Sequence, residues 1–214
     1  INRTSAFSEL IYLLLCGCGV GFSVQKHHVA QLAPAARPST VNTKTFVVPD
    51  SIEGWADSIA VLMVSYLGGI PKFDEYIGCT VEFDYSQIRP AGAPLSSGSK
   101  APGPEGLQRS IEKIRQVLDN RLAGRPRAHL RPIDVYDVIM HSADAVISGG
   151  VRRSATIALF SPDDEEMAKA KTGNWFTENP QRGRSNNSAL LIRDETTKEQ
   201  FEQLMGWVQE FGEP

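Results

Sequence analysis

The chain has 214 residues, of which 41% are hydrophobic and 22% charged, and its formal net charge at pH 7 is −3. This composition is typical of a globular domain that buries an apolar core, and the lack of a basic excess argues against direct binding to nucleic acid. Three cysteines give no even disulfide framework, which favours a reducing compartment such as the cytoplasm.

An apolar segment near the start of the chain, residues 10–24, is too short to cross a bilayer. It also lacks the basic start and the small-residue cleavage site of a secretory signal. We therefore expect residues 5–15 to form an apolar helix that ends at glycines. Residues 17–22 are rich in glycine, but a nucleotide-binding glycine loop needs a strand before it and a helix after it. Close backbone packing between a helix and a strand is therefore the preferred interpretation.

Cys16 and Cys18, followed by His27 and His28, are candidate metal ligands. Structural zinc sites usually separate paired cysteines by about two to four residues, and a single intervening residue with adjacent histidines fits that pattern badly. We therefore predict buried thiols and surface histidines in place of a metal site. Cys79 lies just before a strand and is expected to be a small core residue.

The middle of the chain alternates between strand and helix patterns. A short strand is predicted at residues 45–48, after a possible linker at residues 37–45 that does not divide the chain into domains. Asp50 and Ser51 precede a helical pattern at residues 54–67. The segment has the composition of a capping box, so one of these two residues is expected to cap the helix.

A strand at residues 80–85 leads through Arg89 into a loop rich in glycine, proline and serine that extends to residue 106. Pro104 opens a helix that continues to about residue 122. The apolar face of this helix is expected to consist of Leu107, Ile111, Ile114 and Leu118. The free amides of a helix start after such a loop make a candidate anion site, and a purely structural crossover is the alternative.

The second half of the chain continues the alternation. The predicted elements are a basic connector at 124–131, a helix at 133–147, a strand at 155–160, a short helix at 162–171, a strand at 189–192 and a helix at 197–211. The short helix has acids first and lysines last, as the helix dipole favours. Strands that alternate with helices predict an α/β fold.

A candidate ligand loop lies between the helix at 133–147 and the strand at 155–160. It consists of Gly149, Gly150, Val151, Arg152, Arg153 and Ser154. Two glycines give the backbone freedom, and the paired cations suit an anionic, planar ligand. The alternative is a solvated arginine pair after a helix C-terminus, where cations are favoured.

A second polar segment, residues 181–188, precedes the predicted strand at 189–192. Amide and hydroxyl side chains such as Asn186 and Ser188 at the start of a strand can bind the hydroxyls of a sugar. A capped turn is the alternative interpretation.

Five motifs follow one another in a characteristic order. They are Asp-Ser-x-Glu-Gly-Trp at 50–55, Ile-Arg-Pro-x-Gly-Ala-Pro at 88–94, Ala-Pro-Gly-Pro at 101–104, Gly-Gly-Val-Arg-Arg-Ser-Ala at 149–155 and Ser-Asn-Asn-Ser at 185–188. Together they resemble the middle of a class II, adenosylcobalamin-dependent ribonucleotide reductase, and the resemblance covers nearly the whole chain. The forms of the first, fourth and fifth motifs resemble the monomeric, triphosphate-reducing type.

The resemblance implies that residues 1–214 are the central part of a ten-stranded α/β barrel, incomplete at both ends and including the specificity-effector region. It implies reduction of ribonucleotides by a thiyl radical that adenosylcobalamin generates, with a thioredoxin-like reductant, a deoxynucleotide effector and no membrane. The enzyme would act in the cytoplasm, or in the host cytoplasm if it is virus-encoded. The chain contains no Asn-Pro-Cys-x-Glu segment. We therefore assign no catalytic residue, place the cobalamin contacts mostly outside the chain, and expect the piece alone to be poorly folded and inactive.

The resemblance also implies roles for individual residues. Residues 149–154 match the specificity loop, in which Arg152 would contact the substrate base. Asp50 and Ser51 match the start of the effector-binding helix. Asn186 and Ser188 lie where the family places the edge of the substrate pocket.

Two other functions remain open on the sequence. One is a nucleotide-binding regulatory module without reductase chemistry. The other is a different barrel enzyme whose loops bind phosphate.

Overall fold

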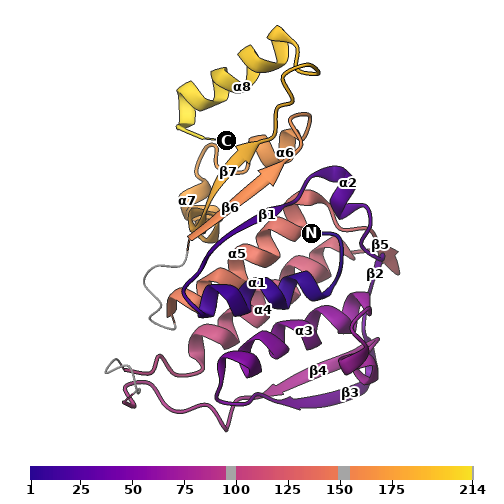
Figure 1. The fold of residues 1–214 in the computed structure, drawn as a ribbon. Helices are drawn as coiled ribbons and strands as arrows, with labels where there is room; N and C mark the ends of the chain where they lie inside the picture. The colour runs from indigo at the N-terminus through magenta and orange to yellow at the C-terminus, as the bar shows by residue number, and fades with distance from the viewer. Residues whose placement is uncertain (95–99, 149–154, 214) are drawn as a thin grey trace.

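The computed structural model describes residues 1–94, 100–148 and 155–213 (Figure 1). The helices are α1 (Ser5–Leu15), α2 (Lys26–Val29), α3 (Ile52–Leu67), α4 (Glu105–Arg121), α5 (Pro132–Ser148), α6 (Glu165–Ala168), α7 (Trp175–Glu178) and α8 (Lys198–Phe211), with 3-10 helices η1 (Pro71–Tyr76) and η2 (Pro180–Arg184). The strands are β1 (Gly19–Ser23), β2 (Ala35–Ala36), β3 (Ser39–Val47), β4 (Cys79–Asp84), β5 (Arg127–Ala128), β6 (Ala155–Phe160) and β7 (Ser185–Ala189). Along these residues no helix combines the length and apolarity needed to cross a membrane.

The strands form three small sheets, and the two larger pairings are parallel. β1, β6 and β7 make a three-stranded parallel sheet, β3 and β4 a parallel pair, and β2 and β5 a short antiparallel pair. Figure 1 shows the long helices α1, α3, α4 and α5 between the three-stranded sheet and the β3–β4 pair. The predicted α/β class is confirmed, with parallel strands joined through helices.

The core lies among the four long helices. α4 buries Leu107, Ile111, Ile114 and Leu118, the four side chains predicted for its apolar face. α3 is the most enclosed helix, because nearly all of its side chains from Trp55 to Leu67 are buried. Each fully buried aliphatic side chain contributes about 1.5–3 kcal/mol, so α3 and its neighbours provide much of the stability of this region.

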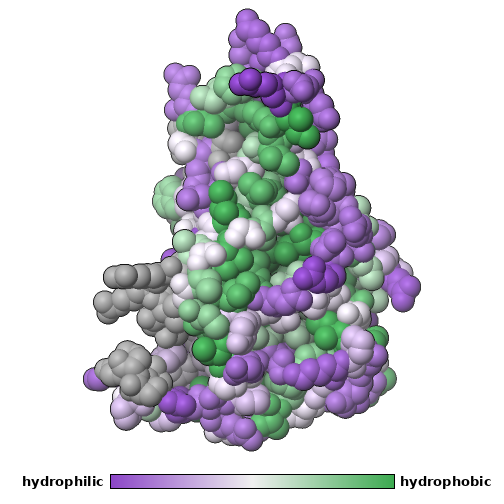
Figure 2. All heavy atoms as spheres, viewed as in Figure 1, coloured by the Kyte–Doolittle hydropathy of each residue, from purple (hydrophilic) through white to green (hydrophobic). Residues whose placement is uncertain are grey.

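One face of the three-stranded sheet is open and partly apolar. Ile157 on β6 remains 40% exposed, although Ala158 and Phe160 on the other side of the same strand are completely buried. Figure 2 shows apolar residues gathered along the middle of the face on which α1, β1 and β6 lie. The sheet therefore has one side covered by helices and one side without a partner in the described residues.

Three predicted boundaries were wrong. The possible linker at 37–45 is mostly strand β3, which begins at Ser39 and pairs with β4; its polar, largely exposed residues hide the strand pattern. The helix predicted at 162–171 is shorter, since only α6 is helical there. Asp164 caps α6, because its carboxylate accepts a hydrogen bond from the backbone N–H of Met167. The strand predicted at 189–192 is β7, which lies earlier, so residues 185–188 are the strand itself and not a capped turn.

The glycine-rich segment after α1 is a corner that leads into a strand, as predicted. Gly17 has φ of 80°, a left-handed conformation that favours glycine, and β1 then begins at Gly19. Gly21 pairs with Ile157, and a Cβ placed on Gly21 would lie 3.2 Å from the Ile157 Cγ2. Close strand packing explains these glycines.

Gly54, in the first turn of α3, lies against the preceding loop. A Cβ on Gly54 would come within 2.3 Å of the carbonyl oxygen of Pro49, which is backbone and cannot rotate away. Gly206 in α8 has no atom within 4 Å of the corresponding position. The two helical glycines can therefore be compared directly, since an added methyl group would clash at Gly54 and would meet no atom at Gly206.

We expect Gly54→Ala to lower the free energy of unfolding by about 3 kcal/mol, the upper part of the usual range for overpacking. Gly206→Ala should instead be neutral or stabilise by up to about 1 kcal/mol through helix propensity. Thermal and urea unfolding of the two variants, each made in the complete protein, measure the difference. Equal stability of the two variants would contradict the close contact at Pro49.

Candidate functional site

A cavity of about 240 Å³ lies at the N-terminal end of α3. Its lining comes from four segments of the chain: Leu15, then Asp50, Ser51, Ile52 and Trp55, then Ile88 and Arg89, then Ala101, Pro102 and Gly103. The fold therefore brings together the two motifs that the sequence marked separately, the start of α3 and the loop before α4.

Ser51 is the residue that caps α3. Its backbone is extended, with φ of −150° and ψ of 164°, and its hydroxyl accepts a hydrogen bond of 3.0 Å from the backbone N–H of Gly54. An N-cap side chain satisfies one of the amides that the first helical turn leaves unpaired. Of the two candidates for the cap, the structure selects Ser51, and the carboxylate of Asp50 is free for another role.

Asp50 forms an ion pair with Arg89, which follows β4 in the chain and also lines the cavity. The Nε of Arg89 donates to Oδ2 of Asp50, and the two side chains are 42% and 30% exposed, respectively. Among the contacts of the described residues, Arg89 uses only Nε in this pair, so its other two nitrogens are available to an anion. A guanidinium suits phosphate because its planar donors match the oxygens.

The walls of the cavity are mainly apolar. Trp55, Ile88 and Pro102 line it beside the Asp50–Arg89 pair. Small-molecule sites commonly combine apolar walls with a few placed polar groups. The arrangement can hold a ligand with an anionic end, a hydroxyl that donates to a carboxylate, and a flat apolar part.

The loop before α4 supplies the third wall. Backbone bonds from Ala101 to the carbonyl of Ala93 and from Gly92 to the carbonyl of Ala101 fix the two ends of the loop against each other. Gly103, with φ of 77°, lies against the carboxylate of Glu105 at the start of α4. This carboxylate disfavours a second negative charge at the start of α4. The guanidinium of Arg89 is therefore a better binding group for an anion than the free amides of that helix start.

Residues 149–154, which include Arg152 and Arg153, lie outside the described residues. Their place in the chain is known, because α5 ends at Ser148 and β6 begins at Ala155. The assignment of these residues as a specificity loop stays a prediction.

Asn186 and Ser188 lie on β7, in register with Ile157 and Leu159 of β6. Side chains alternate along a strand, and here Ser185 and Asn187 are buried while Asn186 is exposed and Ser188 half-buried. The two predicted substrate residues therefore share the open face of the sheet.

The buried side of β7 contacts Tyr136 of α5, a residue that the sequence did not single out. The hydroxyls of Tyr136 and Ser185 are 2.9 Å apart, and Ser185 donates to Oδ1 of Asn187 at 2.9 Å. Burial raises the pKa of Tyr136 to about 12, so its hydroxyl keeps its proton at neutral pH. Lys171 donates to the carbonyl of Ser185. This network anchors β7 to α5 and explains why a strand made largely of polar residues is stable.

The cysteines are arranged differently from the prediction. Cys16 and Cys18 are exposed, because they lie at the corner where α1 ends, whereas Cys79 is buried as expected. The rings of His27 and His28 contact each other, with centroids 4.0 Å apart. Within the described ranges, no group of three or more His, Cys, Asp or Glu side chains is placed to hold a metal ion.

Known proteins with similar sequences and structures share one description. No protein-family model matches the chain. It is 35% identical, over 68% of its length, to the "Probable adenosylcobalamin-dependent ribonucleoside-triphosphate reductase" of Dictyostelium discoideum, covering 18% of that protein. It is 28% identical, over 97% of its length, to the adenosylcobalamin-dependent ribonucleoside-triphosphate reductase of Lactobacillus delbrueckii subsp. bulgaricus, covering 31% of that protein.

A solved structure has a similar fold. A crystal structure of a B-12 dependent (class II) ribonucleotide reductase superposes on 99% of the chain with a TM-score of 0.80 and 24% sequence identity. The chain spans 32% of that structure, and no more than about a third of the curated relatives named above. The chain therefore belongs to the family of adenosylcobalamin-dependent, class II ribonucleotide reductases.

Proposed function

We propose that the complete protein reduces ribonucleoside triphosphates to deoxyribonucleotides, with base specificity under allosteric control. The observation that carries this proposal is the cavity at the start of α3, where Asp50, Arg89 and apolar walls meet. The names of the relatives support the reaction and the triphosphate substrate.

The three-stranded sheet fits a part of a ten-stranded barrel. All of its strands are parallel, helices cover one face, and the other face is open and partly apolar. In a closed barrel such a face would lie inside, where further strands would cover it. Residues 1–214 would then be the central part of the barrel. Asn186 and Ser188 would lie at the edge of the substrate pocket, together with Arg152.

The cavity at the start of α3 would bind a deoxynucleotide effector. Asp50 would accept a hydrogen bond from the deoxyribose hydroxyl, and Arg89 would bind phosphate. Trp55 and Ile88 would pack against the flat part of the nucleotide. Ser51 would act indirectly, since its hydroxyl caps the helix that holds Asp50 in place.

Residues 149–154 would transmit the effector's identity to the substrate. The segment joins α5 to β6, and its two glycines permit more than one backbone conformation. An effector that favours one conformation would change which base Arg152 contacts, and this is an allosteric coupling between two sites.

The cavity at the start of α3 does not fit the cobalamin cofactor. Cobalamin is much larger than this cavity of about 240 Å³, so we expect its contacts to lie mostly outside this chain. When bound to the complete protein, adenosylcobalamin would supply the radical chemistry. A thioredoxin-like protein would supply the electrons. We assign no step of either process to the residues of this chain.

The complete protein, with adenosylcobalamin and a dithiol reductant, should convert ribonucleoside triphosphates to their deoxy forms. Chromatography of the nucleotides measures the products, and ribonucleoside diphosphates serve as the parallel substrates. Deoxynucleotide binding without any reduction of either substrate class would contradict the reaction and favour a regulatory module.

Asp50→Ala and Ser51→Ala should separate effector binding from helix capping. The exposed Asp50–Arg89 pair contributes little to folding, so Asp50→Ala should hardly change the melting temperature. It should nevertheless weaken deoxynucleotide binding at least about tenfold, which corresponds to about 1.4 kcal/mol. Ser51→Ala should lower the free energy of unfolding by about 1 kcal/mol through loss of the cap. Calorimetric titration and thermal unfolding of both variants measure these effects, and unchanged affinity in Asp50→Ala would exclude Asp50 from the site.

Arg152→Ala should reduce the effect of each effector on base preference, because the contact that reads the base is lost. The affinity for the effector should change less than about threefold, because the cavity at α3 is intact. This is well below a tenfold change, which corresponds to about 1.4 kcal/mol. Competition assays with all four ribonucleotides and each effector measure the preference. The same preference pattern as in the unsubstituted enzyme would disprove the role of Arg152.

A further inference from the structure

A second cavity, of about 770 Å³, lies between α4, α5 and the segment from α7 to η2. It shares no lining residue with the cavity at the start of α3. Its volume is in the range of about 300–1,000 Å³ that is usual for small-molecule sites. The motifs that carry the proposed reductase function do not account for it.

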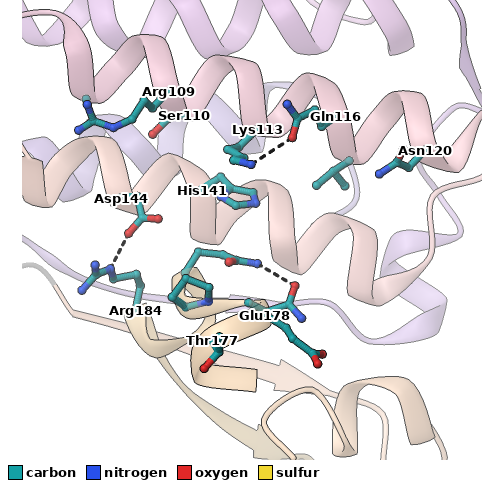
Figure 3. A pocket seen from close by; sticks show the side chains of 15 residues that line it. Arg109, Ser110, Lys113, Gln116, Asn120, His141, Asp144, Thr177, Glu178 and Arg184 are labelled. Carbon is teal, nitrogen blue, oxygen red and sulfur yellow. Dashed lines mark hydrogen bonds and ion pairs between the residues drawn. The ribbon is translucent and has the colours of Figure 1, made fainter. Parts of the chain in front are cut away.

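Cationic side chains line two opposite walls of this cavity. Arg109 and Lys113 lie one turn apart on the exposed side of α4, and Arg184 ends η2 on the other wall. Figure 3 shows Arg109 and Arg184 toward one end of the cavity, with Lys113 and His141 nearer its middle. Residues spaced four apart on a helix face the same side, which places the two α4 cations together.

Among the described residues, the carboxylates of the lining pair only with Arg184, through its Nε, and leave the two α4 cations without an ion pair. Asp144 is paired with Arg184, with 2.6 Å between Oδ1 and Nε. Lys113 donates to the neutral amide of Gln116 at 3.2 Å. Among the described residues no ion pair involves Arg109 or Lys113, and Glu178 is the remaining acid of the lining. The α4 wall therefore keeps an excess of positive charge.

The rest of the lining is polar and able to bind through hydrogen bonds. Ser110, Gln116 and Asn120 face the cavity from α4, and Thr177 from α7. Amides and hydroxyls next to guanidinium and ammonium groups suit phosphate oxygens and the polar body that carries them. An apolar ligand would leave these groups unpaired.

We propose that this cavity is a second anion site that binds a phosphorylated small molecule through Arg109, Lys113 and Arg184. The site is separate from the proposed effector cavity and goes beyond the proposed reductase activity. The phosphates would lie between the α4 cations and Arg184, and the amides of Gln116 and Asn120 would hold the rest of the ligand.

His141 provides a local readout of occupancy. Burial lowers the pKa of its imidazole; Asp137 and Asp144 act in the opposite direction, and Lys113 and Arg182 add to the lowering. A bound phosphate would favour the protonated ring and raise this pKa. The effect would be absent if the anion bound elsewhere.

The test uses inorganic tripolyphosphate as the probe and the complete protein. Calorimetric titration should show binding that weakens at least tenfold in the double variant Arg109→Gln/Lys113→Gln. The control Arg193→Gln/Lys198→Gln removes the same charge from exposed positions outside the cavity and should stay within twofold. NMR titration should show a higher His141 pKa with the probe in the unsubstituted protein, but not in the double variant.

Three results would overturn the proposal. They are no binding of the probe at millimolar concentration, equal affinity in the double variant and the control, and binding that is lost only in Arg89→Gln. The last result would assign the probe to the cavity at α3 and would leave the proposed effector site intact. Failure of the present proposal is therefore distinguishable from failure of that one.

Discussion

The start of α3 is the constraint on which the proposed site depends. α3 is enclosed by the core along nearly its whole length, so its first turn has one position relative to α1 and β4. Ser51 satisfies a free amide of that turn, and the contact between Gly54 and Pro49 lets the preceding loop approach closely. The combination holds Asp50 at the cavity without using its carboxylate in the helix, and Arg89 can then pair with it.

The two faces of β7 explain how one polar strand serves both stability and binding. Ser185 and Asn187 face α5 and join the hydroxyl of Tyr136, so buried polar groups replace the usual apolar contacts. Asn186 faces the opposite side, where the sheet is open. Alternation along a strand therefore separates an anchoring network from the residues proposed to contact substrate.

Much of the fold could be predicted from local sequence patterns. The apolar periodicity of α4 gave the four buried side chains, and the segment from Thr197 to Gln200 forms the capping box that starts α8 at its predicted place. Elements whose stability comes from distant partners were placed less well. β3 and β7 are rich in polar residues, and only their pairing with β4 and β6 makes them strands. The contact between Tyr136 and Ser185 could not be predicted for the same reason, since only the tertiary structure brings α5 and β7 together.

The candidate site shows the same division. The sequence marked Asp50, Ser51 and the loop after Arg89 as separate features, and only the fold shows that they line one cavity. Choosing between Asp50 and Ser51 as the cap required the geometry of the first turn, because both residue types cap helices well.

A crystal structure of the complete protein with a bound deoxynucleoside triphosphate tests the central claim most directly. The account predicts phosphate oxygens within hydrogen-bonding distance of Arg89, the deoxyribose hydroxyl at the carboxylate of Asp50, and the Ser51 cap unchanged. A nucleotide bound elsewhere, with the Asp50–Arg89 pair and its cavity empty, would contradict it.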